Sequence, residues 1–131
     1  MKVFEEKDQY ELCIETEKNR IILDFGECQD PAKLPNYNKH VREALKKVTP
    51  GYSLMASITE KTKPPKLAIT KMLKESQQDF INGGVNKTAV VVPSKAILQK
   101  MTLLVVTKLS GMNIKVFSER NKAEKWLDEK D

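Results

Sequence analysis

The stretch KTAVVVPSKAILQKMTLLVVTKLSGMNIKVFS, residues 87–118, decides the fold class. It opens on an apolar run, residues 89–92, that is rich in β-branched side chains and does not alternate with polar ones. Such a run predicts a strand that is buried on both faces. Pro93 ends this strand, because proline has no N–H to donate to a neighbouring strand.

A helix follows, from Ser94 to Leu109. Serine is a good N-terminal cap, since its hydroxyl accepts hydrogen bonds from first-turn amides. Apolar residues recur at helical spacing: Ile97, Met101, Leu104, Val105 and Leu109. Gly111 ends the helix, and residues 114–117 return as a strand. The stretch is therefore a β-α-β unit, whose crossover is expected to be right-handed.

The rest of the chain predicts a hairpin followed by alternating helices and strands. Residues 10–16 alternate between apolar and polar, and residues 20–26 return after a polar turn, which is typical of an antiparallel hairpin. Residues 3–4 suggest an edge strand before it. The other predicted elements are a helix at 36–48, a strand at 52–59, a helix at 66–82 and a last helix capped by Ser118. The order β-β-α-β-α-β-α-β-α predicts an α/β domain with a mixed, mostly parallel sheet.

Length and composition indicate one ordinary globular domain over residues 1–131. Hydrophobic residues make up 40% and charged residues 31% of the chain. No apolar stretch near the start suggests a signal peptide, and no run approaches the roughly 18 residues that span a bilayer. We therefore expect a cytoplasmic protein without a transmembrane segment.

Charge is distributed unevenly. Residues 1–30 carry a net charge of −5, residues 31–115 carry +11, and residues 116–131 carry −1. The basic middle is either a solvated lysine face or a surface that attracts nucleic acid, anionic lipid or an acidic protein. No aromatic residue lies among the lysines of residues 61–74 to stack on bases, so we expect no specific nucleic-acid binding.

Residues suited to catalysis are few. His40 is the only histidine, no Gly-x-Ser-x-Gly motif is present, and Cys13 and Cys28 lack partners at metal-ligand spacing. The sequence therefore predicts no enzyme, no cofactor and no metal. Two further side chains are informative: Asp24 is expected to face water, and Trp126 to anchor the last helix in the core, together with Ala123 and Leu127.

The chain resembles a family of small bacterial proteins called SpoIIAA-like, or STAS/SEC14-like, which share the STAS fold of the anti-sigma-factor antagonists. Four segments carry the resemblance: EKNRIILDFGE (17–27), LKKVTPGYSLMASI (45–58), GGVNKTAVVVPS (83–94) and GMNIKVFSERNKAEKWL (111–127). It implies a right-handed superhelix of β-α turns, frequent self-association and no catalytic activity.

One departure from the regulatory members of that fold concerns phosphorylation. They carry a phosphorylatable serine, next to an aspartate and before a glycine, where the central strand meets the next helix. The corresponding residues here, 57–65, contain no Asp-Ser-Ser-Gly. Ser57, Thr59 and Thr62 are nearby hydroxyls, but none matches the motif, so the resemblance does not extend to a phospho-switch.

The loop at residues 60–65 is the first candidate site. It follows an internal strand and leads to a helix N-terminus, where ligands and anions bind in α/β proteins. We expect Lys61, Thr62, Lys63 and Lys66 to bind a partner or an anion. The alternative is an ordinary solvated loop.

The second candidate is the helix 94–109. Leu103 and Val106 lie outside its apolar stripe, so the helix presents apolar side chains around most of its surface. They are candidate residues of a homodimer interface. The alternatives are a neighbouring helix of the same chain and an apolar ligand such as a lipid.

These observations favour a non-catalytic binding or regulatory module, cytoplasmic and bacterial, that acts as a homodimer and docks an unidentified protein. The alternative is a carrier of a small apolar or anionic ligand. An enzyme remains a third, less favoured class.

Overall fold

The computed structural model describes residues 2–6, 9–26, 36–59, 67–92 and 113–129. Its strands are β1 (Lys2–Glu6), β2 (Tyr10–Glu15), β3 (Arg20–Phe25), β4 (Ser53–Ser57), β5 (Lys87–Val91) and β6 (Ile114–Phe117). Its helices are α1 (Tyr37–Leu45), α2 (Leu67–Asn82) and α4 (Arg120–Asp128), with a 3-10 turn, η1 (Thr16–Lys18), between β2 and β3.

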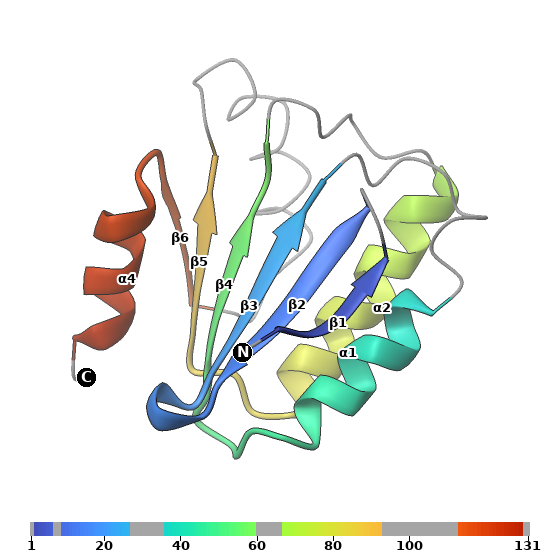
Figure 1. Cartoon of the computed structure of the whole chain (residues 1–131), viewed down its shortest axis with the longest axis horizontal. Helices are drawn as coiled ribbons and strands as arrows, with labels where there is room; N and C mark the ends of the chain where they lie inside the picture. Colours follow the sequence, from blue (N-terminus) through green and yellow to red (C-terminus); the bar gives the residue numbers. More distant parts are fainter. Residues whose placement is uncertain (1, 7–8, 27–35, 60–66, 93–112, 130–131) are drawn as a thin grey trace.

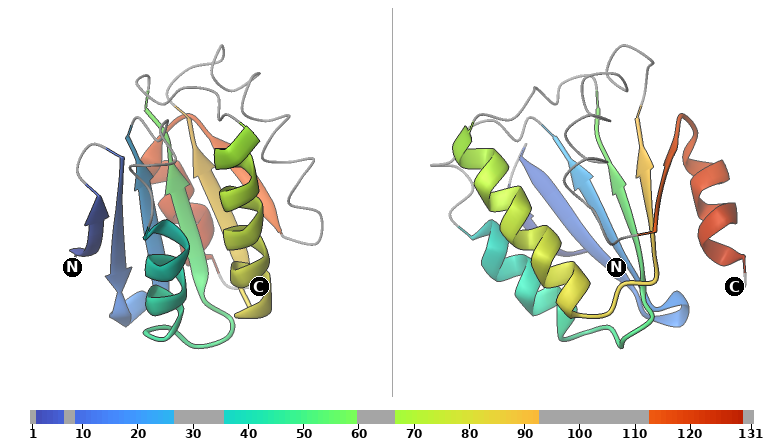
Figure 2. Two further views of the ribbon diagram at one scale, coloured as in Figure 1. Left: turned by 90° about the vertical axis from the view of Figure 1, so that its right-hand side faces the viewer. Right: turned by 180° about the vertical axis from the view of Figure 1, so that it is seen from behind.

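The described strands form one sheet in chain order, from β1 to β6 (Figure 1). The β1–β2 and β2–β3 pairs are antiparallel, whereas β3–β4, β4–β5 and β5–β6 are parallel. The left view of Figure 2 shows α1 and α2 in front of the sheet and α4 behind it. The connections from β3 to β4 and from β4 to β5 run in the same direction across the sheet. If both are right-handed, their helices, α1 and α2, lie on the same face.

The mixed, mostly parallel sheet predicted from the sequence is confirmed. The hairpin is β2–β3, and the suggested edge strand at residues 3–4 is part of β1. The strands of the β-α-β unit, β5 and β6, are parallel neighbours. The helix predicted at residues 94–109 lies outside the described residues. The N-cap of the last helix was predicted one residue too early, at Ser118: Glu119 occupies the N-cap of α4, and its side chain makes no capping hydrogen bond.

Each face of the sheet has its own core. Alternation along β2 and β3 sends Leu12 and Leu23 to the side of α1 and α2, and Ile22 to the side of α4. On the α4 side, Ala123 and Leu127 are buried, as predicted. Trp126 packs on the same core but is only half-buried, so its prediction as a core anchor holds in part.

The end of α2 shows why residue 84 is glycine. The N–H of Gly84 donates to the Ile81 carbonyl (3.0 Å) and that of Val85 to the Phe80 carbonyl (3.3 Å), the pairing of a Schellman motif. Gly84 has a left-handed φ of +88°, and a Cβ there would lie 3.0 Å from the Cβ of Pro50. The predicted turn is confirmed, and it requires glycine at its second position.

Turns at the amino ends of the parallel strands are bonded to one another. The N–H of Ser53, at the start of β4, donates to the Asn19 carbonyl at 3.1 Å. The N–H of Gly51 donates to the Gly84 carbonyl at 2.7 Å. We call these three turns, which lead into β3, β4 and β5, the amino-edge turns.

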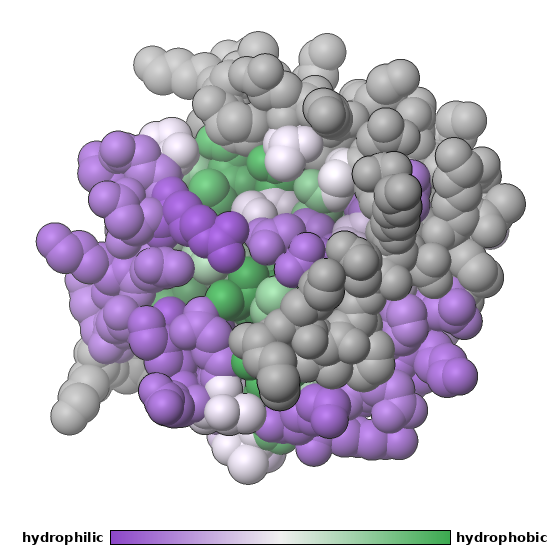
Figure 3. Space-filling view, viewed as in Figure 1, coloured by the Kyte–Doolittle hydropathy of each residue, from purple (hydrophilic) through white to green (hydrophobic). Residues whose placement is uncertain are grey.

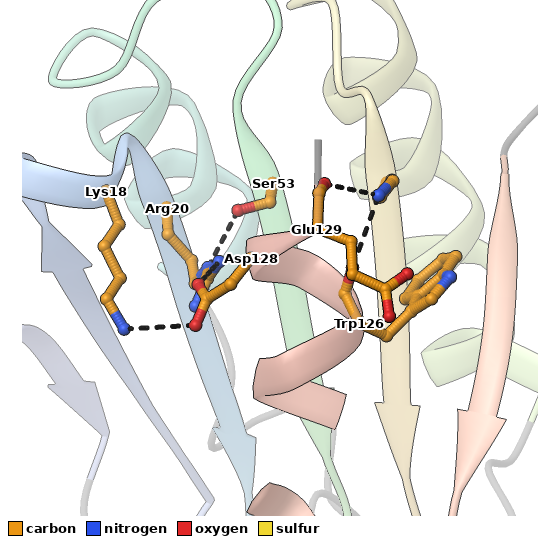
Figure 4. Close-up of polar contacts among 7 residues, drawn as sticks. Lys18, Arg20, Ser53, Trp126, Asp128 and Glu129 are labelled. Carbon is orange, nitrogen blue, oxygen red and sulfur yellow. Dashed lines mark hydrogen bonds and ion pairs between the residues drawn. The ribbon is translucent and has the colours of Figure 1, made fainter. Parts of the chain in front are cut away.

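Two buried cations hold α4 on the sheet (Figure 4). Arg20, 2% exposed, donates from Nε to Ser53 Oγ (2.8 Å) and from Nη2 to Asp128 Oδ1 (2.7 Å). Lys87, 6% exposed, donates from Nζ to the backbone carbonyls of Trp126 (3.3 Å) and Glu129 (2.8 Å). Cations at a helix C-terminus satisfy its last carbonyls and complement its dipole. The C-terminal end of α4 is therefore bound by charge as well as by apolar packing.

The glycine requirement gives a first prediction. Gly84→Ala places a side chain at positive φ and against Pro50, and we expect it to lower the free energy of unfolding by about 1–3 kcal/mol in urea titrations. Gly51→Ala is the matched control, because Gly51 also has positive φ (+91°) but a Cβ there meets nothing within 4 Å. Equal losses in the two variants would show that the contact with Pro50 is unimportant.

A second prediction concerns the α4 anchor. Asp128→Ala leaves Arg20 without its carboxylate, and we expect a loss of about 1–2 kcal/mol at pH 7, because Asp128 is half-exposed. Lys18→Ala is the control: Lys18 is exposed and lies 3.8 Å from Asp128, so its loss should be within about 0.5 kcal/mol.

The Asp128→Ala variant should also change how the stability of the protein depends on pH. The hydrogen bond from Arg20 lowers the pKa of Asp128 below its ordinary value. A lowered pKa in the folded state stabilises the protein above the unfolded-state pKa, and this contribution disappears as pH falls through the folded-state pKa. The stability difference between wild type and Asp128→Ala should therefore vanish in acid. A difference that stays constant down to the lowest pH would contradict an ionic anchor.

Candidate functional site

The carboxyl ends of β3, β4 and β5 meet at the upper edge of the sheet in Figure 1. In open α/β sheets this is the edge at which ligands bind. Asp24 of β3 and Ser57 of β4 are partners in the parallel register, near the end of each strand. Residues 60–66 continue from β4 toward α2, so the candidate loop starts close to this pair.

Asp24, Ser57 and Arg120 make a polar group that we call the carboxyl-end cluster. The Ser57 hydroxyl donates to Asp24 Oδ1, and Arg120 Nη1 lies 3.2 Å from the same oxygen. The side chains of Asp24 and Ser57 lie on the face of the sheet that α4 covers. Asp24 is two residues from Ile22, which belongs to the core on that face, and Ser57 is its partner in the register. The first turn of α4 brings Arg120 over them.

The cluster is accessible from solvent. The Asp24 side chain is 34% exposed and that of Arg120 is 46% exposed. Arg120 Nε also lies 3.9 Å from Glu124 Oε1, so the guanidinium has two carboxylate neighbours. Half-exposed ion pairs contribute little to stability and exchange partners readily. The cluster can thus offer a guanidinium to an anionic group and a carboxylate to a cationic one.

No arrangement for nucleophilic catalysis accompanies Ser57 in the described residues. A serine nucleophile needs a base within hydrogen-bond reach. His40 is half-buried on α1, where its Nδ1 is hydrogen-bonded to the Tyr10 hydroxyl. Tyr10 belongs to the core on the α1 side, so the histidine lies across the sheet from Ser57. Asp24, the nearest carboxylate, is shared with Arg120.

Cys13 is also unsuited to nucleophilic chemistry. It lies on β2, next to Glu11, to which its thiol donates at 3.5 Å. Burial, followed by the hydrogen bond to Glu11 and the charge of that carboxylate, raises the pKa of Cys13. The thiol is therefore protonated at neutral pH, whereas reactive cysteines are thiolates. Within the described ranges, no three His, Cys, Asp or Glu side chains are grouped to hold a metal ion.

The residues that the sequence nominated fall outside the described ranges. These are Lys61, Thr62, Lys63 and Lys66 of the candidate loop, and Leu103 and Val106 of the candidate interface. Their roles stay predictions. The prediction that Asp24 faces water holds in part: its side chain is 34% exposed, but β3 is an interior strand, and Ser57 and Arg120 both contact this carboxylate.

Arg120 was missed by the sequence analysis. Its partner is 96 positions earlier, and nothing local distinguishes it from the other exposed charges of α4. The available signal was the aspartate within a strand, a residue type that strands disfavour and that therefore needs a partner.

Figure 3 shows the molecule from the same side as Figure 1. Hydrophobic residues are visible on this face, and hydrophilic residues surround them. Phe117 and Trp126 are half-buried and pack on the α4-side core, with ring centroids 5.8 Å apart.

In the part of the chain that the structure describes, no helix has both the length and the apolar character needed to cross a bilayer.

Comparison with known proteins places this chain in a family. The SpoIIAA-like family model matches residues 2–128, nearly the whole sequence. No curated protein and no solved structure matches the chain. The resemblance drawn from the four sequence segments is confirmed, and the α/β sheet with its N-terminal hairpin agrees with the STAS fold of that family. This protein belongs to the SpoIIAA-like family.

Proposed function

We propose that this protein is a non-catalytic binding module that docks another protein at the carboxyl edge of its sheet. The observation that carries the proposal is the carboxyl-end cluster. Its charges are preformed and half-exposed, and Ser57 shortly precedes in the sequence the segment 60–66, which contains three lysines. Family membership supports a regulatory or binding role. The location of His40 and the raised pKa of Cys13 favour binding over nucleophilic catalysis.

The lysines of residues 60–66 indicate that the proposed partner presents an acidic surface. Lys61, Lys63 and Lys66 would attract an acidic surface, and the half-exposed guanidinium of Arg120 has the same sign of charge. A phosphate on Thr59 or Thr62 would be partly neutralised by these lysines and so would repel an acidic partner less. The docking is thus constitutive, without a phospho-switch.

Charge reversal tests the docking proposal. The triple variant Lys61→Glu, Lys63→Glu, Lys66→Glu should lose partner recovery from the native host. We expect these lysines to lie in a solvated segment, so thermal stability should be kept, because substitutions at exposed positions shift stability by less than about 0.5 kcal/mol. The control carries the same change in net charge at the exposed Lys46, Lys47 and Lys125. Recovery that is undiminished in the first variant, or equally reduced in both, would remove the segment 60–66 from the interface.

Phosphosite mapping on protein from the same host checks the constitutive reading separately. We expect Thr59 and Thr62 to be unmodified. Stoichiometric phosphate on either hydroxyl would refute the proposal that docking is constitutive.

Self-association is the second part of the proposal. Leu103 and Val106 would form a two-fold interface, in which the same apolar patch meets itself. Leu103→Lys with Val106→Glu should give a soluble monomer in light scattering, whereas Gln78→Glu with Asn121→Lys, at exposed positions of α2 and α4, should leave the mass unchanged. A dimer that persists in the first variant excludes this interface, and gross unfolding would place both residues in the intrachain core.

The alternative function is a carrier of a small apolar or anionic ligand. Native mass spectrometry of protein purified from its host separates the two functions. A bound small molecule at one copy per chain would favour the carrier, and a ligand-free chain that still recovers a protein partner favours the docking module.

A further inference from the structure

Among the described strands β6 is the last of the sheet, and on its outer side its peptide groups have no hydrogen-bond partner within the described residues. Its neighbour on one side is β5, and no described strand follows it on the other. The N–H of Thr88 donates to the Asn113 carbonyl, and the N–H of Val92 donates to the Phe117 carbonyl, both at 2.8 Å. Peptide groups alternate in direction along a strand, so those of Lys115 also face β5.

The peptide groups of Ile114 and Val116 therefore point away from the sheet. Within the described part of the chain, no hydrogen bond reaches them from that side. An exposed edge of this kind is a template for another strand, since an added strand completes its hydrogen bonds.

Side chains on the two faces of β6 give this edge a definite chemistry. On the α1 and α2 side, Ile114 and Val116 are half-buried and pack beside the buried Val90. On the α4 side, the exposed Lys115 holds its Nζ 5.7 Å from the Phe117 ring and 6.0 Å from the Trp126 ring. One face is thus aliphatic, and the other combines a cation with two half-exposed aromatic rings.

Pairing of β6 with a second copy of itself is disfavoured. In the antiparallel arrangement with the greatest overlap, Ile114 of each copy pairs with Val116 of the other, which sets Lys115 directly opposite its own counterpart. Residues in such non-hydrogen-bonded pairs have Cα atoms about 4.5 Å apart, and like charges there are destabilising. A carboxylate at the same position is attracted instead.

We propose that the free edge of β6 binds an extended segment of a partner protein, in which acidic and aliphatic side chains alternate. Its carboxylates face Lys115 beside Trp126 and Phe117, and its aliphatic residues face Ile114 and Val116. The proposal deepens the docking function proposed above, and it adds a second contact surface with its own peptide specificity.

A defined peptide tests this surface. The probe is a capped peptide of alternating valine and glutamate, titrated into ¹⁵N-labelled protein, with the matched valine–lysine peptide as control. We expect the Val-Glu peptide to shift the amide signals of Ile114 and Val116 and the Trp126 indole signal, and to slow hydrogen exchange at the two amides. The Val-Lys peptide should bind about three- to tenfold more weakly. Absence of shifts at β6, or equal binding of both peptides, overturns the proposal.

Two variants separate charge from backbone pairing. Lys115→Glu should reverse the preference, so that the Val-Lys peptide binds better. Val116→Pro removes an outward N–H without removing a bond to β5, which is the position where an edge strand tolerates proline, and it should abolish binding. Should Val116→Pro fail to fold, the wild-type protein with a Val-Glu peptide N-methylated at every residue gives the same test. Binding of the N-methylated peptide would contradict strand addition.

Two outcomes distinguish this inference from the docking function itself. Concentration-dependent shifts of the Ile114 and Val116 amides without peptide would assign the edge to a second copy of this chain and refute an acidic partner. A negative peptide result, combined with partner loss in the Lys61, Lys63 and Lys66 variant, removes the β6 edge alone and leaves docking at the carboxyl edge in place.

Discussion

The buried positive charge at the amino ends of β3 and β5 is the constraint on which the α4 side of this protein depends. Arg20 and Lys87 are almost fully buried, and burying a cation is costly unless it is paired and hydrogen-bonded. The C-terminal end of α4 supplies the Asp128 carboxylate and two backbone carbonyls. Because that end is fixed, the first turn of the helix lies over Asp24, and the Trp126 ring lies beside β6. Both proposed binding surfaces therefore follow from one anchoring interaction.

Much of the sheet could be predicted because its signals are local. The alternation of Tyr10, Leu12 and Ile14 predicts a strand with one buried face, and β2 has that burial pattern. The buried cations could not be predicted in the same way. Arg20 is the first residue of its strand, and its carboxylate partner is 108 positions later. Asp24 likewise depends on Arg120, so a local pattern assigns both charges to solvent, whereas the tertiary fold pairs them.

The two faces of the sheet divide the reactive groups of the chain. The tyrosine–histidine pair lies on the α1 side, and the serine–aspartate pair lies on the α4 side. The sheet thus lies between the histidine and the serine, and the charged groups at the carboxyl edge, which we propose for binding, have no histidine beside them among the described residues. The candidate loop itself could be located only to the span between β4 and α2, because its lysines are outside the described residues.

The amino-edge turns have a consequence for how relatives of this chain can diverge. The backbone hydrogen bonds from Ser53 to Asn19 and from Gly51 to Gly84 link the turns that lead into three strands. An insertion of one residue in any of these turns would displace the hydrogen bonds of its neighbours and shift the pairing of adjacent strands. Length variation is therefore expected to accumulate at the opposite edge, where we propose that binding takes place. On this expectation, a change of loop length there would alter binding specificity while the hydrogen-bonded turns that hold the strands in register stay the same.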